Sequence, residues 1–409
     1  MKQPTMILKQ CDKIFISFLL PVITIMVNII IIMVKAKNQQ IIIKFNNFNN
    51  SNIFHKPFLE CVGSGHAKLA LRDDWQQALL TVKESIGFKR VRFHGLLDDD
   101  MGLVQSKTLL RNITTIKKNN DHNVKNYILN FTKIQQVFDF LIYEANVMPY
   151  IELSFMPGVL ASGTTTYLHY KARTDPPKNY DDWGLVINSF GQFLVQRYGL
   201  LNISKLYFEV WNEPNLKNPL PHLVGEFWTG TQSEYYKLYE TTSKALKNVS
   251  SKLQIGGPTT SGTPAWLLSF IKYCQNNSIP LDFISSHSYP SEVKVDSFIE
   301  AIQKSVDISK QINKTFFLSE FNDGLWFGCC HDRSYAASFL IRTAYALQNT
   351  NNNNVPGGGG NELKMMIDHQ YLAGISYWTF SDIFEELYMD RDPFHNGYGL
   401  LTIDNIPSK

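Results

Sequence analysis

Short apolar runs alternate with longer stretches of helical periodicity throughout the sequence beyond residue 55. Such alternation is typical of repeated βα units and of a parallel sheet. The apolar runs predict eight strands, at Phe58–Val62, Arg90–Phe93, Met148–Leu153, Leu206–Trp211, Leu253–Gly257, Phe283–Ser286, Thr315–Ser319 and Gly374–Trp378. The periodic stretches predict seven helices, at 73–86, 127–146, 181–198, 233–249, 264–277, 297–312 and 334–348. The simplest closed arrangement of these elements is a (β/α)8 barrel, the TIM-barrel fold.

An open, doubly wound sheet is the alternative arrangement of the same elements. It is less well supported, because no Gly-x-Gly-x-x-Gly turn follows the first strand and no Gly-Lys-Ser/Thr loop occurs. The run 349–360, "NTNNNNVPGGGG", is of low complexity and is interpreted as a surface insertion before the last strand. Residues 58–409 are therefore predicted to form one barrel domain that contains this insertion.

The amino-terminal region is predicted to carry a targeting signal. Ile14–Val34 contains no charge and follows three lysines, and it is long enough to cross a bilayer. A signal-anchor segment and a cleaved signal peptide both fit residues 1–43, and an Asn-rich linker over 44–57 follows. Either form directs the protein into the secretory pathway. It is thus expected to be secreted, lysosomal or membrane-anchored.

N-glycosylation sequons agree with that compartment. They occur at Asn49, Asn112, Asn130, Asn202, Asn248, Asn276 and Asn313. The cysteines beyond the targeting region are Cys61, Cys274, Cys329 and Cys330. Adjacent cysteines seldom bridge each other. Two alternatives therefore fit the sequence: a disulfide from Cys329 or Cys330 to a distant cysteine, or free thiols.

Charge and composition limit the partners of the protein. A formal net charge of +3, without a run of five or more Lys/Arg, argues against nucleic acid as a partner. The aromatic content of 13% favours a cleft that stacks flat ligands, and carbohydrate is one candidate. No Cys-x-x-Cys or His-x-x-x-His spacing indicates a metal site, and we expect no cofactor.

Two glutamates follow predicted strands, at Glu213 in "EVWNEP" and at Glu320 in "FFLSEFN". The carboxyl ends of barrel strands carry the chemistry of this fold, so the two carboxylates are expected to converge there. Pro214 disfavours helix at Glu213 and fixes the turn. Glu209 points into the barrel by strand alternation, and we expect a structural pairing with an arginine of a neighbouring strand.

Converging carboxylates are what hydrolysis of a glycosidic bond requires, because one acts as acid and the other as nucleophile or base. Arg92 is expected to lower the pKa of Glu320, and the ring of Trp378 or Phe155 to keep Glu213 partly desolvated. Further polar or aromatic residues follow the other strands, namely His94, Asn212, His287 and Tyr289.

The ordered motifs of residues 58–407 resemble glycoside hydrolase family 39, the family of β-xylosidases and α-L-iduronidases. The residues that carry this resemblance include "ESIGFKRVRFHGLLDDDMG", "FEVWNEPNLKN", "FISSHSYP", "LSEFN" and "SYWTFSDIFEE". "WNEPNL" and "SYWTFSDIFEE" look more like the β-xylosidase branch. Family members usually continue with a last barrel helix and a β-sandwich, which this chain is expected to lack because its sequence ends at Lys409.

The resemblance implies a role for each matching residue. Glu213 would be the acid/base and Glu320 the nucleophile of a retaining mechanism. Arg92 and Tyr289 would hold the nucleophile. The residues implied to bind the sugar are His94, Asn212, His287, Trp378, Glu385 and Glu386.

Three hypotheses for function follow. The first is a retaining, β-xylosidase-like glycoside hydrolase. The second is an α-L-iduronidase-like hydrolase of glycosaminoglycans, which needs a Lys or Arg for the uronic acid, and Arg92 and Arg391 are the candidates. The third is a catalytically impaired, membrane-tethered sugar-binding protein.

Overall fold

The computed structural model describes residues 56–107, 126–216, 227–262, 266–290, 295–324, 331, 334–348, 367–383 and 397–407, and the backbone of three short strands. These strands are β1 (Val34–Ala36), its antiparallel partner β2 (Gln39–Ile41), and β6 (His122–Val124). Outside the described residues lie most of the predicted targeting segment, the 349–360 insertion, and four predicted site or disulfide residues, Cys329, Cys330, Glu385 and Glu386. In the described part of the chain, no helix combines the length and the apolarity that a membrane span requires.

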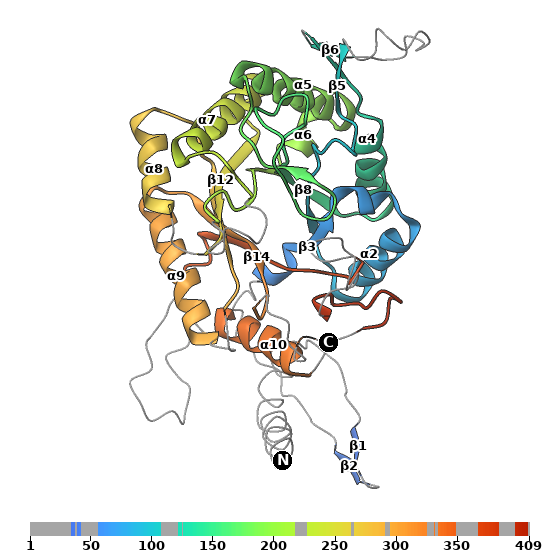
Figure 1. The fold of residues 1–409 in the computed structure, drawn as a ribbon. Helices are drawn as coiled ribbons and strands as arrows, with labels where there is room; N and C mark the ends of the chain where they lie inside the picture. The colour runs from blue at the N-terminus through green and yellow to red at the C-terminus, as the bar shows by residue number, and fades with distance from the viewer. Residues whose placement is uncertain are drawn as a thin grey trace, which may run out of the picture.

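Eight parallel strands form a closed barrel, as predicted (Figure 1). In the order of the barrel they are β3 (Cys61–His66), β4 (Arg90–His94), β8 (Met148–Leu153), β11 (Tyr207–Val210), β12 (Gln254–Thr260), β13 (Phe283–Ser288), β14 (Thr315–Phe321) and β15 (Leu372–Tyr377). The first and last strands pair directly, through Ser376 with Cys61 and Tyr377 with Val62. The barrel is therefore closed within the described residues.

Helices lie outside the strands in Figure 1 and connect each strand to the next. They are α2 (Asp73–Ile86), α4 (Thr132–Asp139) with the π-helical turn η3 (Phe140–Glu144), α5 (Tyr180–Tyr198) with the short α6 (Leu200–Ile203), α7 (Gln232–Val249), α8 (Leu267–Asn276), α9 (Val295–Gln311) and α10 (Ser334–Gln348). Smaller elements are the 3-10 turns η1 (Pro57–Leu59) and η2 (Ala67–Leu71) and the strand pair β9 (Thr166–Tyr167) and β10 (Ala172–Arg173). Apolar faces of these helices form one core with the outer sides of the strands.

Several predicted starts were wrong by two or more residues, and for two of them the structure shows the reason. The first strand begins at Cys61 rather than Phe58, because Pro57 opens a 3-10 turn there. The predicted helix 127–146 begins at Thr132, since Tyr127–Leu129 forms β7 instead. Strand β7 pairs with β6 and with β5 (Val104–Ser106) in a small antiparallel sheet outside the barrel.

Aromatic side chains fill one layer of the barrel interior. Tyr150, Phe283 and Phe317 are buried there with Cys61, and Tyr207 packs against them. Tyr207 and Glu209 thus face inward, as strand alternation predicted, but the strand ends at Val210 rather than Trp211. The aromatic layer fills the barrel interior below the polar residues. The polar groups therefore face the end of the barrel at which the strands have their carboxyl ends.

Candidate active site

Glu213 lies just past the end of β11 in a constrained turn. Trp211 and Glu213 have φ angles of 76° and 42°, a left-handed conformation that costs non-glycine residues of order 1–3 kcal/mol each. The turn is held because the Glu213 backbone N–H donates to Thr259 O at 2.9 Å. Trp211 is anchored separately, since its indole N–H donates to Phe227 O at 2.7 Å. Strained backbone that surrounding contacts maintain is typical of functional sites.

Glu320 is the second-to-last residue of β14 and lies opposite Glu213 across the barrel mouth. The two carboxylates share His287 of β13, whose Nδ1 is 2.8 Å from Glu213 Oε1 and 3.4 Å from Glu320 Oε2. One oxygen of each glutamate and this nitrogen all lie within 4.8 Å of one another. Both glutamates are buried, at 6% and 4% exposure. The predicted convergence of the two carboxylates is therefore present in the structure.

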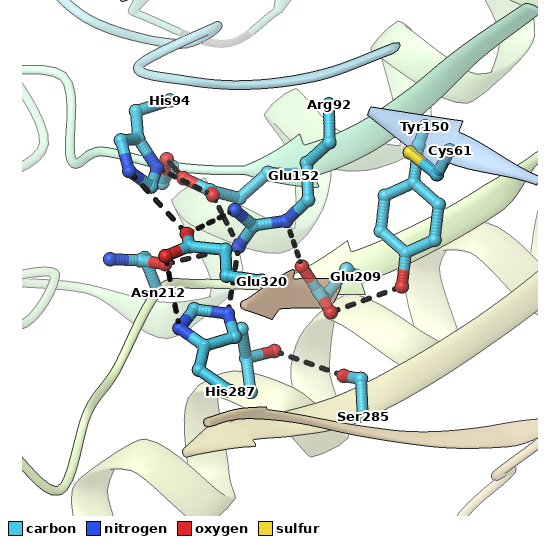
Figure 2. A network of polar contacts seen from close by, with 12 residues as sticks. Cys61, Arg92, His94, Tyr150, Glu152, Glu209, Asn212, Ser285, His287 and Glu320 are labelled. Atoms are coloured by element: carbon cyan, nitrogen blue, oxygen red, sulfur yellow. Dashed lines mark hydrogen bonds and ion pairs between the residues drawn. The ribbon is translucent and has the colours of Figure 1, made fainter. Parts of the chain in front are cut away.

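Arg92 of β4 lies at the centre of the polar network (Figure 2). Its guanidinium contacts Glu152, Glu209 and Glu320, at N–O distances of 2.6, 2.6 and 2.5 Å. The expected pairing of Glu209 with an arginine is confirmed, although Arg92 comes from the second strand away, with β8 in between. Tyr150 also donates its hydroxyl to Glu209 at 3.1 Å.

Glu320 is held by a further hydrogen bond. The hydroxyl of Tyr289 donates to Glu320 Oε2 at 2.6 Å, so both oxygens of the carboxylate have partners. Burial alone would raise the pKa of Glu320, but the charges of His287, Arg92 and His94 and the Tyr289 hydroxyl outweigh it. The resulting pKa is about 2, lower than the ordinary value, as predicted for Arg92. Glu320 is thus ionised at neutral pH, which is the state a nucleophile needs.

His94 of β4 lies between two carboxylates. Its Nδ1 is 2.7 Å from Glu152 Oε2, and its Nε2 is 3.6 Å from Glu320 Oε1. Burial lowers the pKa of His94, but Glu152 and Glu320 raise it more strongly, to about 9. The ring is therefore an imidazolium at neutral pH. Its Nε2–H lies on the side of Glu320 Oε1.

The remaining predicted residues border this network. Asn212 accepts from Arg92 through Oδ1 at 3.0 Å, and Figure 2 shows its amide nitrogen directed away from Arg92. Trp378 is 2% exposed and its ring centroid lies 4.6 Å from that of His94. Phe155 is buried against Trp211 and Phe227.

Glu152 is a site residue that the sequence analysis missed. It is fully buried on β8 and contacts both Arg92 and His94, and Ser154 donates its hydroxyl to it. The signal was present in "PYIELSF", where Tyr150, Glu152 and Ser154 alternate and so share the inner face of the strand.

Two sets of these residues have the spacing of metal ligands. They are His94 with Glu152 and Glu320, and Glu213 with His287 and Glu320. Glu320 belongs to both sets, and its two oxygens already bind Arg92 and Tyr289. A cation in either set would have to compete with the guanidinium charge at 2.5 Å. The electrostatics of the site thus favour a cation-free carboxylate pair.

A closed (β/α)8 barrel with two adjacent carboxylates at the ends of its fourth and seventh strands defines the class of glycoside-hydrolase barrels. Residues 41–409 match the family model for "Glycosyl hydrolases family 39". The chain belongs to this family.

Relatives and solved structures agree with this assignment. A β-xylosidase of Caldicellulosiruptor saccharolyticus is 36% identical over 367 residues, which cover 86% of this chain and 66% of that protein. A β-xylosidase of Geobacillus stearothermophilus is 32% identical, over 88% of this chain and 67% of that protein. The structure of a family 39 β-xylosidase from Caulobacter crescentus superposes with a TM-score of 0.68 at 26% identity, covering 86% of this chain and 69% of the other. The chain spans about two thirds of the length of these relatives.

Proposed function

We propose that the protein is a retaining, β-xylosidase-like glycoside hydrolase. The observation that carries this proposal is the proximity of Glu213 and Glu320, which have carboxylate oxygens within 4.8 Å of each other. Arg92 and Tyr289 also donate hydrogen bonds to Glu320. Retaining enzymes hold their two carboxyl groups about 5–5.5 Å apart, whereas inverting enzymes need about 6.5–9.5 Å for a water molecule. The short separation therefore favours direct attack by a carboxylate.

The reaction takes place in two steps. In the first, Glu320 attacks the anomeric carbon and forms an ester, while the bond to the leaving oxygen breaks and Glu213 protonates that oxygen. In the second, Glu213 removes a proton from water, the water oxygen attacks the anomeric carbon, and the ester bond to Glu320 breaks. Both residues return to their starting states, and the configuration of the sugar is retained.

His287 serves both steps by its position. Its Nδ1 lies 2.8 Å from Glu213 and 3.4 Å from Glu320, so the ring is next to both carboxylates in each step. Asn212 is oriented by Arg92 toward a sugar hydroxyl, and Trp378 and His94 form the wall next to Glu320. Glu385 and Glu386 remain proposed subsite residues from the family resemblance.

A uronic acid substrate fits the described site less well than a neutral xyloside. The substrate carboxylate would need a cation, but the guanidinium of Arg92 is already shared by three glutamates. The other candidate, Arg391, lies outside the described residues. A non-catalytic sugar-binding role is also less favoured, because both carboxylates and their supporting groups are assembled.

Hydrolysis of aryl β-xyloside by the full chain, with aryl α-iduronide in parallel, tests the proposal. Glu213→Ala and Glu320→Ala should each lose activity by at least about 10²-fold. Azide should restore turnover in each variant and give opposite products. The Glu213 variant should release the β-azide by attack on its glycosyl-enzyme, and the Glu320 variant the α-azide by direct displacement.

A folded chain that releases neither aglycone would contradict the hydrolase assignment. Release from the iduronide alone would replace the xyloside by a uronic acid substrate. Azide products of the same configuration from both variants would contradict the assigned roles of Glu213 and Glu320.

We also propose that the protein passes through the secretory pathway. The sequon residues that the structure describes, Asn130, Asn202, Asn248, Asn276 and Asn313, are all exposed, as glycan acceptors must be. Expression in a eukaryotic secretory host should give a protein whose mass falls on treatment with an N-glycosidase. An unmodified intracellular product from a host that glycosylates other proteins would contradict this proposal.

A further inference from the structure

Three titratable residues form a cluster beside the catalytic network but separate from it. His66 ends β3, and Asp98 and Asp100 belong to the loop that follows β4. His66 Nε2 lies 3.5 Å from Asp98 Oδ2 and 3.2 Å from Asp100 Oδ1. All three atoms are within 4.8 Å of one another. The mechanism proposed above uses none of them.

The contacts inside this cluster are close, but they are not hydrogen bonds. His66 is 1% exposed and Asp98 is 4% exposed, yet His66 Nε2, Asp98 Oδ2 and Asp100 Oδ1 all lack a hydrogen-bond partner. Buried polar atoms are almost always hydrogen-bonded, so three such atoms without a hydrogen bond, all within 4.8 Å of one another, call for an explanation. The orientation of the His66 ring is fixed, since it stacks on Tyr170 with 3.7 Å between centroids and 8° between planes.

Tetrahedral metal coordination accounts for both the distances and the missing hydrogen bonds. With metal–ligand bonds of about 2.1 Å, the edges of a tetrahedron measure about 3.4 Å, close to the two separations in the cluster. In such a tetrahedron the lone pair of His66 Nε2 points at the metal, and the two carboxylate oxygens lie to either side of that line. An N–H in that direction is directed between the oxygens, and neither oxygen satisfies hydrogen-bond geometry.

We propose that His66, Asp98 and Asp100 form a divalent-metal site of the zinc class. One imidazole and two carboxylates are ligands that Zn²⁺ accepts, with a water molecule in the fourth position. Three protein ligands that include a nitrogen are unlike a calcium site, which takes six to eight oxygens. The cluster borders a cavity of about 430 Å³, which Asp100 lines together with Lys68, His169 and Tyr170.

The position of the cluster gives the metal a structural role next to the active site. His66 pairs with His94 across the β3–β4 edge of the barrel, and Gly95 follows His94 directly. A Cβ at Gly95 would lie 2.3 Å from Asp98 Oδ2 and 3.0 Å from the His66 ring. Asp98 also accepts from the backbone N–H of Phe155 through its other oxygen, at 3.2 Å. A metal would thus join the ends of three strands, β3, β4 and β8, around His94.

Metal titration of the full chain tests the proposal, with ZnCl2 and CoCl2 followed by calorimetry and visible absorption. Glu320→Gln is the background, because Glu320 belongs to both other candidate sets. We expect one Zn²⁺ per chain and the strong visible absorption of tetrahedral Co²⁺. Asp98→Asn and Asp100→Asn should weaken binding by at least about 10-fold, since each removes a ligand charge.

Asp99→Asn is the matched control, since Asp99 accepts from the Gly158 backbone N–H at 2.8 Å and lies outside the cluster. It should bind metal like the parent. Asp100 is partly exposed, with 27% of its side chain accessible, so its variant tests the site even where Asp98→Asn impairs folding. No Zn²⁺ binding by the parent, or equal affinity in all variants, would overturn the proposal, as would Co²⁺ spectra of the octahedral aqua ion.

Discussion

The charge of His94 depends on the carboxylates around it. Its pKa of about 9 lies above the ordinary value of 6.5, so the protonated ring stabilises the fold fully below pH 6.5. This stabilisation is lost as the pH rises through about 9. His94→Gln should therefore reduce the free energy of unfolding most at pH 6, by at most roughly 3 kcal/mol, and much less at pH 10. Urea denaturation at both pH values measures this, and an equal loss at both would contradict it.

Glu152 acts on catalysis through His94 rather than by touching the substrate. Replacing it in Glu152→Gln removes the largest influence that raises the pKa of His94. The pKa of His94 should then fall from about 9 toward lower values. The pH profile of the His94 ring signals in NMR measures this shift and separates it from a simple loss of folded protein.

Glu60→Gln is the control for that experiment. Glu60 also pairs with basic residues, Lys89 and Arg90, but before β3 begins, at the opposite end of the barrel from the site. Its pH profile should match that of the parent. An unchanged profile in Glu152→Gln would show that His94 does not need this partner.

At the scale of single elements, β3 is shaped to fit the end of β15. A Cβ at Gly63 would lie 2.5 Å from Cε3 of Trp378 and 3.1 Å from the Tyr377 carbonyl oxygen. Gly63→Ala should displace the Trp378 ring, lower stability by about 1–3 kcal/mol and raise KM. Thermal unfolding and xyloside kinetics measure both effects.

Gly184→Ala provides the comparison for Gly63→Ala. Gly184 lies in α5, and its Cβ would meet only the Thr241 methyl group, at 3.0 Å. Alanine in a helix is favoured over glycine by about 0.5–1 kcal/mol, so little or no stability should be lost and KM should not change. Equal effects of the two substitutions would contradict the proposed contact with Trp378.

Most elements could be predicted because apolar periodicity and strand ends are local properties. Helices 73–86 and 334–348 were predicted with the bounds that the structure has. The ends of β12, β13 and β14 were predicted too early, because these strands continue through Thr, Ser, His and Glu residues, which are also common in loops.

The site was predictable where its residues follow apolar runs, as Glu213 and Glu320 do. Glu152 was missed because it lies inside a strand, where burial of a carboxylate depends on a distant arginine. The left-handed backbone at Trp211 and Glu213 could not be predicted either, since neither residue is a glycine. Both features come from tertiary contacts that a local pattern does not contain.

For the whole molecule, Arg92 joins β4 to β8, β11 and β14. Removing one member of a buried ion pair leaves the other charge uncompensated and costs about 3–5 kcal/mol. Arg92→Met should therefore destabilise the barrel by at least about that amount in urea denaturation. Adding Glu209→Gln should recover part of the loss, because one unpaired charge is removed. A single variant as stable as the parent would contradict the central role of the guanidinium.

The same network has a consequence for the time course of folding. Arg92 is separated from Glu209 by 117 residues and from Glu320 by 228 residues along the chain. Contacts of such sequence separation form slowly, because a long loop must close before they are made. A nascent chain can pair Arg92 with Glu152 and Glu209 earlier, but it lacks the pair with Glu320 until β14 has joined the sheet. During refolding, enzymatic activity should accordingly return after most of the helical signal, once the barrel is complete.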